Sequence, residues 1–360
     1  MVNVSKLNLI GKSEKELNDF FYSIGERSYR SRQVLSWLHK KGAVDISLMT
    51  DISMQVREKL SNQFCIDIPV PISTQSSVDG TQKFLFPVGN DQFIESVYIP
   101  EATRATLCIS SQVGCAMDCS FCATGYQGFS RNLDANEIMG QFIAVSSYLN
   151  SNNLKPITNV VFMGMGEPLT NLTEVVKVSN LLMSDLLYGI SRRRVTISTS
   201  GVVPNIYKLA GETNASLAIS LHAANDELRN ELVPINKFYN IAQLLEACNF
   251  YAKETKARYI TFEYVMLKEI NDSLVAAKEL AVLLKNFPAK VNLIPFNPFP
   301  ESSYQCSDEY QINKFCKVLQ SKGIFTSIRK TRGDDIDAAC GQLAGKVNDR
   351  IKNRLGQQKL

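Results

Sequence analysis

The stretch Ala105-Thr-Leu-Cys-Ile-Ser-Ser-Gln-Val-Gly-Cys115-Ala-Met-Asp-Cys119-Ser-Phe-Cys122 decides the fold. It opens on a β-rich run and then places three cysteines in one short loop. Three thiolates at this spacing can wrap a compact metal centre. Zinc prefers a fourth protein ligand, and no histidine lies nearby; Cys108 is a conceivable but distant substitute. A 4Fe–4S cluster on Cys115, Cys119 and Cys122 would instead keep one iron open for a small molecule, which predicts a catalytic centre.

Beyond this loop, short β-rich runs alternate with helical stretches. The runs that predict strands are 105–110, 159–163, 194–198, 216–221, 259–266, 291–296 and 325–329. The stretches that predict helices are 133–149, 173–182, 241–253, 273–284 and 308–322. This alternation favours βαβ units around a parallel sheet. Six or seven units suit an α/β fold with a partial barrel, in which the carboxyl ends of the strands carry the chemistry.

The chain before residue 100 does not show this alternation of strands and helices. Ser13 and Glu16 form a capping box at the start of a helical region that extends to about residue 62. Extended runs follow, with turns at Asp79-Gly80 and Gly89-Asn90. We therefore expect four parts, which are a helical accessory domain over 1–62, a β-rich connection over 63–100, the strand–helix core over 101–335 and a C-terminal segment over 336–360.

Composition fits a soluble protein with a sizeable core, since 45% of the 360 residues are hydrophobic and 21% are charged. No run approaches the roughly 18 apolar residues that cross a bilayer, and the N-terminus lacks the apolar block of a signal peptide. We therefore expect a cytoplasmic protein without membrane contact. The nine cysteines are too few for a disulfide scaffold at this length, and in a reducing compartment clustered cysteines are more often metal ligands or catalysts.

The net charge is only +4, but the basic residues are concentrated in patches. One early patch holds Arg27, Arg30, Arg32, Lys40 and Lys41, a second is the run 192–194, and a third lies between 346 and 359. Such patches can neutralise phosphates, although most are ordinary solvated faces. Of the three, we expect the early patch to contact a phosphate backbone.

Small or polar residues follow several of the predicted strands. Gly166 and Glu167 end the run Phe162-Met-Gly-Met-Gly-Glu-Pro168. The other such residues are Ser198, Ser220, Leu221, His222 and Asn297. Each alone is typical of a loop start or a helix cap. Together, behind the cysteine loop, they fit a ligand that lies across the mouth of a barrel.

Several of these stretches are similar to one family. ATLCISSQVGCAMDCSFCATGYQGFSRNL, VVFMGMGEPLTN, RRVTISTSGVVP, SLHA, VNLIPFNPFP and DIDAACGQL together resemble the RlmN-type RNA methyltransferases of the radical S-adenosylmethionine superfamily. The resemblance covers essentially the whole chain. It implies a partial (β/α)6-type barrel that methylates C2 of an adenosine in the peptidyl-transferase centre of 23S ribosomal RNA and an adenosine of certain transfer RNAs. Pro168 and Val113 favour this family over the Cfr-type enzymes, which methylate C8.

The resemblance also implies a role for each site residue. Cys115, Cys119 and Cys122 would hold the cluster, Cys340 would carry the methyl group as S-methylcysteine, and Cys108 would form a transient disulfide with it. Glu95 would accept a proton. The residues implied to contact S-adenosylmethionine are Gly166, Glu167, Ser198, Ser220, Leu221, His222 and Asn297. Two molecules of S-adenosylmethionine would be consumed per methylation, with electrons from a flavodoxin- or ferredoxin-type donor, and nothing demands more than a monomer.

Two other hypotheses stay open at this stage. One is methylation at C8, or another radical reaction on the same scaffold. The other is an RNA-binding or assembly factor with a structural cluster. On pattern alone Glu95 is a surface residue of an alternating strand, and Cys108 and Cys340 are unrelated free thiols.

Overall fold

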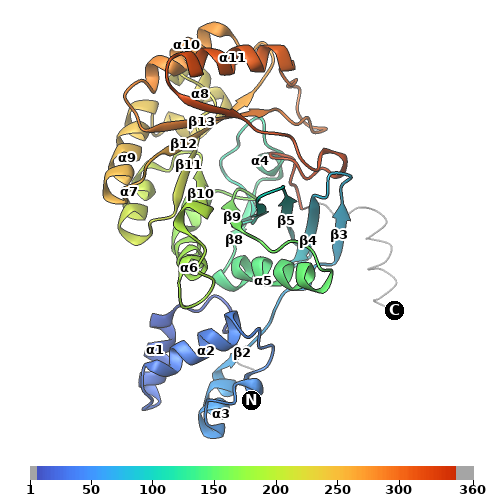
Figure 1. The fold of residues 1–360 in the computed structure, drawn as a ribbon, viewed down its shortest axis with the longest axis vertical. Coiled ribbons are helices and arrows are strands. Elements are labelled where there is room, and N and C mark those ends of the chain that lie inside the picture. Colours follow the sequence, from blue (N-terminus) through green and yellow to red (C-terminus); the bar gives the residue numbers. More distant parts are fainter. Residues whose placement is uncertain (1–5, 346–360) are drawn as a thin grey trace.

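One ten-stranded sheet organises this computed structural model, which describes residues 6–345 (Figure 1). Its order is β14-β13-β12-β11-β10-β9-β6-β5-β4-β3. The parallel part consists of β6 (Ala105–Cys108), β9 (Asn159–Phe162), β10 (Val195–Thr199), β11 (Ser216–Ser220), β12 (Ile260–Met266), β13 (Ala289–Pro295) and β14 (Phe325–Ile328). Each predicted strand matches one of these within two residues. The sheet stays open between its edge strands β3 and β14, so the predicted fold class is confirmed.

Helices connect the parallel strands and cover the outer side of the sheet. They are α5 (Ala135–Ser151), α6 (Leu172–Met183), α7 (Val203–Glu212), α8 (Asp226–Leu232), α9 (Ile241–Glu254), α10 (Leu274–Leu283) and α11 (Glu309–Ser321). The sequence analysis did not predict α7 and α8. Pro204 lies in the first turn of α7, where its missing N–H costs no hydrogen bond, so this proline does not break the helix. One large apolar core joins the strands to the inner faces of these helices.

Three antiparallel strands extend the sheet beyond β6. They are β3 (Ser73–Ser76), β4 (Gln82–Pro87) and β5 (Phe93–Pro100), and the two predicted turns lie between them. Val97 of β5 pairs with Cys108 of β6. The expected boundary near residue 100 therefore falls inside a continuous sheet, and the division into domains stays a prediction.

The N-terminal region is helical, as expected, and has a small core of its own. It contains β1 (Leu7–Asn8), α1 (Glu14–Ser23), α2 (Tyr29–His39), a 3₁₀ turn η1 (Ile46–Leu48), α3 (Met54–Gln63) and β2 (Phe64–Cys65). The Ser13–Glu16 capping box is present. Leu181 and Leu187 of the large domain contribute to this small core, so the two regions share apolar surface.

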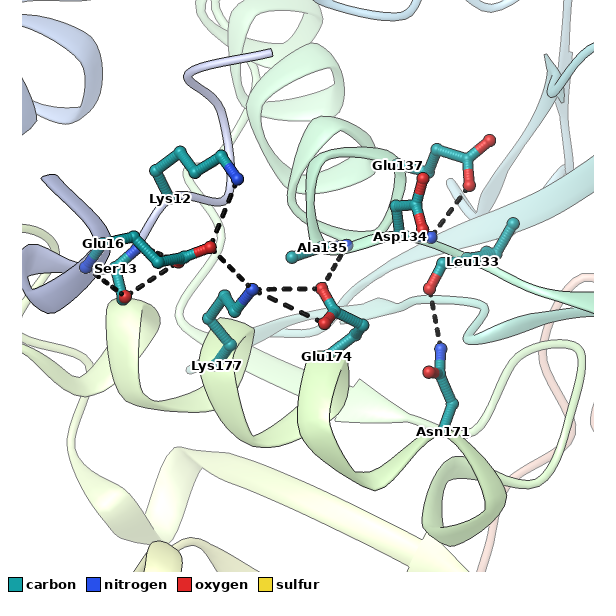
Figure 2. A network of polar contacts seen from close by, with 10 residues as sticks. All are labelled: Lys12, Ser13, Glu16, Leu133, Asp134, Ala135, Glu137, Asn171, Glu174 and Lys177. Atoms are coloured by element: carbon teal, nitrogen blue, oxygen red, sulfur yellow. Dashed lines mark hydrogen bonds and ion pairs between the residues drawn. The ribbon is translucent and has the colours of Figure 1, made fainter. Parts of the chain in front are cut away.

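A chain of ion pairs reinforces this junction, as Figure 2 shows. Lys177 Nζ of α6 lies 3.3 Å from Glu16 Oε1 of α1 and 3.4 Å from Glu174 Oε2. Glu174 Oε2 also accepts a hydrogen bond from the Ala135 N–H at the start of α5 (2.9 Å). Lys177 therefore connects the N-terminal helical region to α6 and to the start of α5.

Part of the early basic patch is already paired within the protein. Arg30 contacts Glu26, and the Arg32 Nε lies 2.7 Å from Glu14 Oε1. Lys41 Nζ lies 3.6 Å from the centre of the Trp37 ring. Arg27 and Lys40 are exposed. The basic stretch beyond residue 345 lies outside the described residues.

Within residues 6–345, no helix is long and apolar enough to cross a membrane.

Candidate active site

The three clustered cysteines lie in the loop between β7 (Gln112–Gly114) and the short helix α4 (Ala123–Gln127). Gly114 has a φ of +73°, and a Cβ there would lie 1.7 Å from the Gly128 carbonyl oxygen. Only a glycine allows this approach between β7 and β8 (Phe129–Asn132). The Cys122 N–H donates to the Cys119 carbonyl (3.1 Å), which turns the loop into α4.

The same loop forms one wall of a cavity of about 160 Å³ at the carboxyl ends of the parallel strands, here called the strand-end cavity. Its lining includes most of the predicted site residues: Cys115, Cys119, Cys122, Gly166, Glu167, Ser198, Ser220, His222, Asn297 and Cys340. Leu221 does not line the cavity, because its side chain is fully buried in the main core. Parallel strands end at one edge of the sheet, which is why these distant residues meet.

The donor set of the cysteine loop fits a cluster of several irons. Burial, and then the neighbouring Cys122 and Cys115, raise the pKa of the Cys119 thiol. Burial also raises the pKa of Cys115 to about 12. The charge of Cys122 contributes to the raised pKa of both Cys115 and Cys119, so the loop favours a cationic group. In residues 6–345, no three His, Cys, Asp or Glu side chains converge on a single metal-ion position. Cluster thiolates need not converge, because each binds a different iron.

Glu167 is held firmly at the mouth of β9. Its Oε2 accepts hydrogen bonds from the Ser200 N–H and the Ser200 hydroxyl, both at 2.8 Å. Its Oε1 accepts from the Leu169 N–H (2.9 Å), at the start of the 3₁₀ turn η2 (Pro168–Asn171). Burial raises the pKa of this carboxyl and the bonds from Ser200 oppose that rise. The carboxylate is thus fixed in direction on the cavity wall.

His222 presents a neutral ring with a defined tautomer. Its Nδ1 accepts the Val265 N–H (2.9 Å), so Nε2 carries the proton. Burial, reinforced by the nearby Arg229, lowers the pKa of His222 to about 3. The ring packs edge-on against Phe121, with 4.5 Å between centroids, and Phe121 lies between Cys119 and Cys122. The backbone of His222 is left-handed (φ +59°), a strained conformation typical of functional sites.

Cys340 lies between two cavities. It lines the strand-end cavity and also a smaller space of about 80 Å³, here called the thiol cavity, which Cys108 lines as well. The Asn297 side-chain amide donates to the Cys340 carbonyl (3.1 Å) and holds the segment in place. Burial raises the pKa of Cys108 to about 12, and the Cys340 thiol adds to that rise. The structure therefore brings these two predicted partners together, both as free thiols.

Glu95 is placed apart from the other predicted residues. It lines a separate cavity of about 180 Å³ and is buried. Its Oε2 accepts from the N–H groups of Ala344 (2.9 Å) and Gly345 (3.2 Å), and its Oε1 lies 3.3 Å from Lys83 Nζ. Glu95 is thus no surface residue, and its carboxylate is occupied by the C-terminal segment.

Three charged residues of the site were missed by the sequence analysis. Glu263 is buried in β12 and lines the strand-end cavity, and Arg329, directly after β14, lines the thiol cavity. Arg229 is completely buried and donates to the carbonyls of Ser200, Ser220 and Leu221. A charged residue inside the apolar run Ile260–Met266 was the available indication for Glu263. Nothing local distinguishes Arg229 or Arg329.

Two family models match the chain. The ribosomal RNA large subunit methyltransferase N-terminal domain matches residues 7–66, and the radical SAM superfamily matches residues 109–281. The chain is 51% identical, over 354 residues, to the dual-specificity RNA methyltransferase RlmN of Francisella tularensis subsp. novicida strain U112. This alignment covers 97% of the chain and 95% of the relative. The corresponding protein of the subspecies mediasiatica strain FSC147 has the same identity and coverage.

A solved structure shows the same architecture. The radical SAM methyltransferase of Sphaerobacter thermophilus superposes with a TM-score of 0.87 at 40% sequence identity, and the match covers 94% of this chain and 100% of that one. The radical SAM superfamily uses S-adenosylmethionine with a 4Fe–4S cluster, and the cysteine loop lies within the matched residues. The chain therefore belongs to the RlmN family of dual-specificity RNA methyltransferases, within the radical S-adenosylmethionine superfamily.

Proposed function

We propose that this protein methylates C2 of an adenosine in 23S ribosomal RNA and in transfer RNA, with Cys340 as the carrier of the methyl group. The position of Cys340 carries the proposal, since this residue lines both the strand-end cavity and the thiol cavity. Cys122 lines the same two cavities and Cys108 lines the second. One thiol thus stands between the proposed cluster site and a second thiol. The names of the relatives support an RNA substrate.

The residues of the strand-end cavity have two different roles, which are to hold the cluster and to surround S-adenosylmethionine. When bound, the cluster and S-adenosylmethionine supply a methyl group and a 5′-deoxyadenosyl radical. Cys115, Cys119 and Cys122 hold the cluster. The residues that surround the cofactor are Gly166, Glu167, Ser198, Ser220, Leu221, His222 and Asn297. Leu221 belongs to this set only through the resemblance to the family, because its side chain packs into the core. The fixed carboxylate of Glu167 can accept hydrogen bonds from an ammonium group, and the Nε2–H of His222 can donate one.

Cys340 and its partners carry out the transfer. Adenine C2 is electron-poor and cannot attack a methyl cation equivalent, whereas a thiolate is a strong nucleophile. Cys340 Sγ would therefore take a methyl group from one S-adenosylmethionine, and the radical would come from a second one, so that two would be consumed per methylation. The transferred carbon bonds to adenine C2 while it is still attached to Cys340 Sγ. Cys108 Sγ then attacks Cys340 Sγ to form a disulfide, the bond from Cys340 Sγ to that carbon breaks, the methylated product leaves, and an external reductant reopens the disulfide.

Glu95 takes the proton that C2 loses. Its Oε2 accepts two N–H groups of the C-terminal segment, so this oxygen can receive a proton only after the segment withdraws. We further propose a monomer in the cytoplasm that receives electrons from a flavodoxin- or ferredoxin-type donor.

Nucleoside analysis after anaerobic reaction tests the proposal. The reconstituted protein is incubated with S-adenosylmethionine, reductant and either ribosomal or transfer RNA fragments. We expect 2-methyladenosine from the wild type and from Cys65→Ala, whose thiol lies in the N-terminal domain, and none from Cys340→Ala. Unimpaired methylation by Cys340→Ala contradicts the carrier role. Formation of 8-methyladenosine would indicate the C8 reaction, and absence of 5′-deoxyadenosine would indicate a structural cluster.

A further inference from the structure

The thiol cavity is lined by a positively charged side chain that has no part in the methyl transfer described above. Arg329 lines this cavity together with Cys108 and Cys340. Burial raises the pKa of the Cys340 thiol, and the charge of the Arg329 guanidinium is the largest effect that opposes this rise. Two other cations at the cavity face elsewhere, because Arg332 Nη1 lies 3.6 Å from Asp79 Oδ2 and Lys330 is exposed.

Arg329 is itself held from two sides. Its backbone N–H donates to the Leu293 carbonyl (2.8 Å), which fixes the end of β14 against β13. Its Nη1 lies 3.8 Å from Glu263 Oε1, and only 24% of the arginine side chain is exposed. The guanidinium is therefore set by the sheet and by one buried carboxylate.

Glu263 has a third partner in the strand-end cavity. Its Oε2 accepts the hydroxyl of Ser198 at 3.3 Å, from β10 and across the intervening strand β11. The donation leaves the lone pairs of Ser198 free to accept a hydrogen bond from a ligand. The result is a polar chain from Ser198 through Glu263 to Arg329, and Arg329 lines the thiol cavity together with Cys340.

We infer that Arg329 is a positioning residue for Cys340, and that Glu263, held by Ser198, aims its guanidinium at the sulfur. The inference rests on the proposed role of Cys340. In that reaction Cys340 gives up its thiol proton to water and uses the freed sulfur electron pair to form the S–C bond, while the donor keeps the pair of the bond that breaks. A guanidinium beside the sulfur stabilises the negative charge at the moment of attack.

The planar fork of arginine explains why this residue type is suited to the position. One edge can face the Glu263 carboxylate while another N–H reaches sulfur, and the geometry is rigid. Lysine offers one compact charge on a flexible stem and cannot hold both directions. If Arg329 served only to neutralise the buried Glu263, lysine would replace it without any effect on Cys340.

Thiol alkylation tests the inference without S-adenosylmethionine or RNA. Cluster-reconstituted protein is treated anaerobically with limiting iodoacetamide at one pH, and peptide mass spectrometry follows Cys340 and, in the same sample, Cys65. We expect Arg329→Gln to slow alkylation of Cys340 about tenfold, because the sulfur loses its stabilising charge, and to leave Cys65 unchanged. Arg329→Lys should recover part of the rate, and Glu263→Gln should lower it less than Arg329→Gln. Arg104→Gln is the matched control, since it removes a guanidinium from an exposed pair with Glu101.

The rate at which Cys340 becomes methylated provides the second measurement. With S-adenosylmethionine varied, Arg329→Gln should lower the maximum loading rate about tenfold and leave the half-saturating concentration unchanged, as expected when an interaction acts in the transition state. If Cys340 of Arg329→Gln is alkylated and methylated at the wild-type rates, the inference is overturned. Full recovery of both rates in Arg329→Lys overturns the positioning role as well, and this variant decides the matter if Arg329→Gln does not fold. A third outcome is that alkylation of Cys340 depends on Arg329 but Cys340 of the wild-type protein never becomes methylated. That outcome contradicts only the proposed function.

Discussion

Two polar networks in this protein use the same kinds of side chain in opposite surroundings. At the domain junction, Lys177 bridges Glu16 and Glu174, and these side chains are 19%, 34% and 26% exposed (Figure 2). Beneath the strand-end cavity, Arg229 is 0% exposed and donates to backbone carbonyls. Water screens the first network, so each ion pair contributes little to the free energy of unfolding. In the second network every partner must be supplied by the protein, so the loss of one partner is costly.

The largest effect should come from the buried side of this comparison. Arg229 donates to the carbonyls of Ser200 (2.6 Å), Ser220 (3.1 Å) and Leu221 (3.1 Å) and to Asn236 Oδ1 (2.7 Å). Burial lowers its pKa to about 10, so the guanidinium stays charged at neutral pH. Arg229→Met leaves these acceptors without a donor and should lower the free energy of unfolding by about 3 to 5 kcal/mol.

Urea unfolding followed by circular dichroism measures this loss. Arg229→Lys should fall between the wild type and Arg229→Met, because one ammonium group cannot reach all the acceptors. A loss below about 1 kcal/mol for Arg229→Met would place Arg229 in the same class as the junction pairs.

An intermediate effect should appear as pH dependence, because each region holds one of the two histidines. Burial lowers the pKa of His39 to about 4 and that of His222 to about 3, from an ordinary value of 6.5. The unfolded chain therefore binds protons that the folded protein does not. The stabilisation is complete above pH 6.5 and falls with decreasing pH by about 1.4 kcal/mol per unit for each histidine.

Unfolding free energies between pH 6.5 and 5 test this sign, since most carboxylates titrate lower. His39→Gln should remove about half of the slope in that interval, and His222→Gln should remove the other half. Equal slopes in the wild type and in both variants would show that neither ring is kept neutral by the fold.

The smallest effect should come from the junction itself. Lys177→Met removes the bridge between Glu16 and Glu174 and should lower the free energy of unfolding by about 0.5 kcal/mol or less. Raising the salt concentration should reduce the difference further, because it screens the ion pairs. Lys208→Met, at an exposed position of α7, is the matched control. A loss above about 2 kcal/mol would mean that the junction behaves like the buried network.

The sequence predicted features that depend on local pattern. The seven parallel strands follow from short β-rich runs, and the clustering of Gly166, Ser198 and Asn297 follows from the shared edge of parallel strands. The surroundings of Glu95 could not be predicted, because its partners Ala344 and Gly345 belong to a segment without periodicity that is distant in the chain. Buried charges such as Arg229 depend on acceptors in three separate stretches, which no local pattern reveals.

The residue after the last clustered cysteine is tied to the residue after the proposed methyl carrier. Ala123 N–H donates to the Gly341 carbonyl (2.7 Å), and the Thr124 hydroxyl donates to the Leu343 carbonyl, 219 residues away in the chain. Both acceptors follow Cys340 within three residues, and both donors start the helix that follows Cys122. The cysteine loop and the segment that holds Cys340 are thus attached to each other through the start of α4. A shift of this helix carries the Cys340 segment with it, whereas the length of the chain between them can change without altering their spacing.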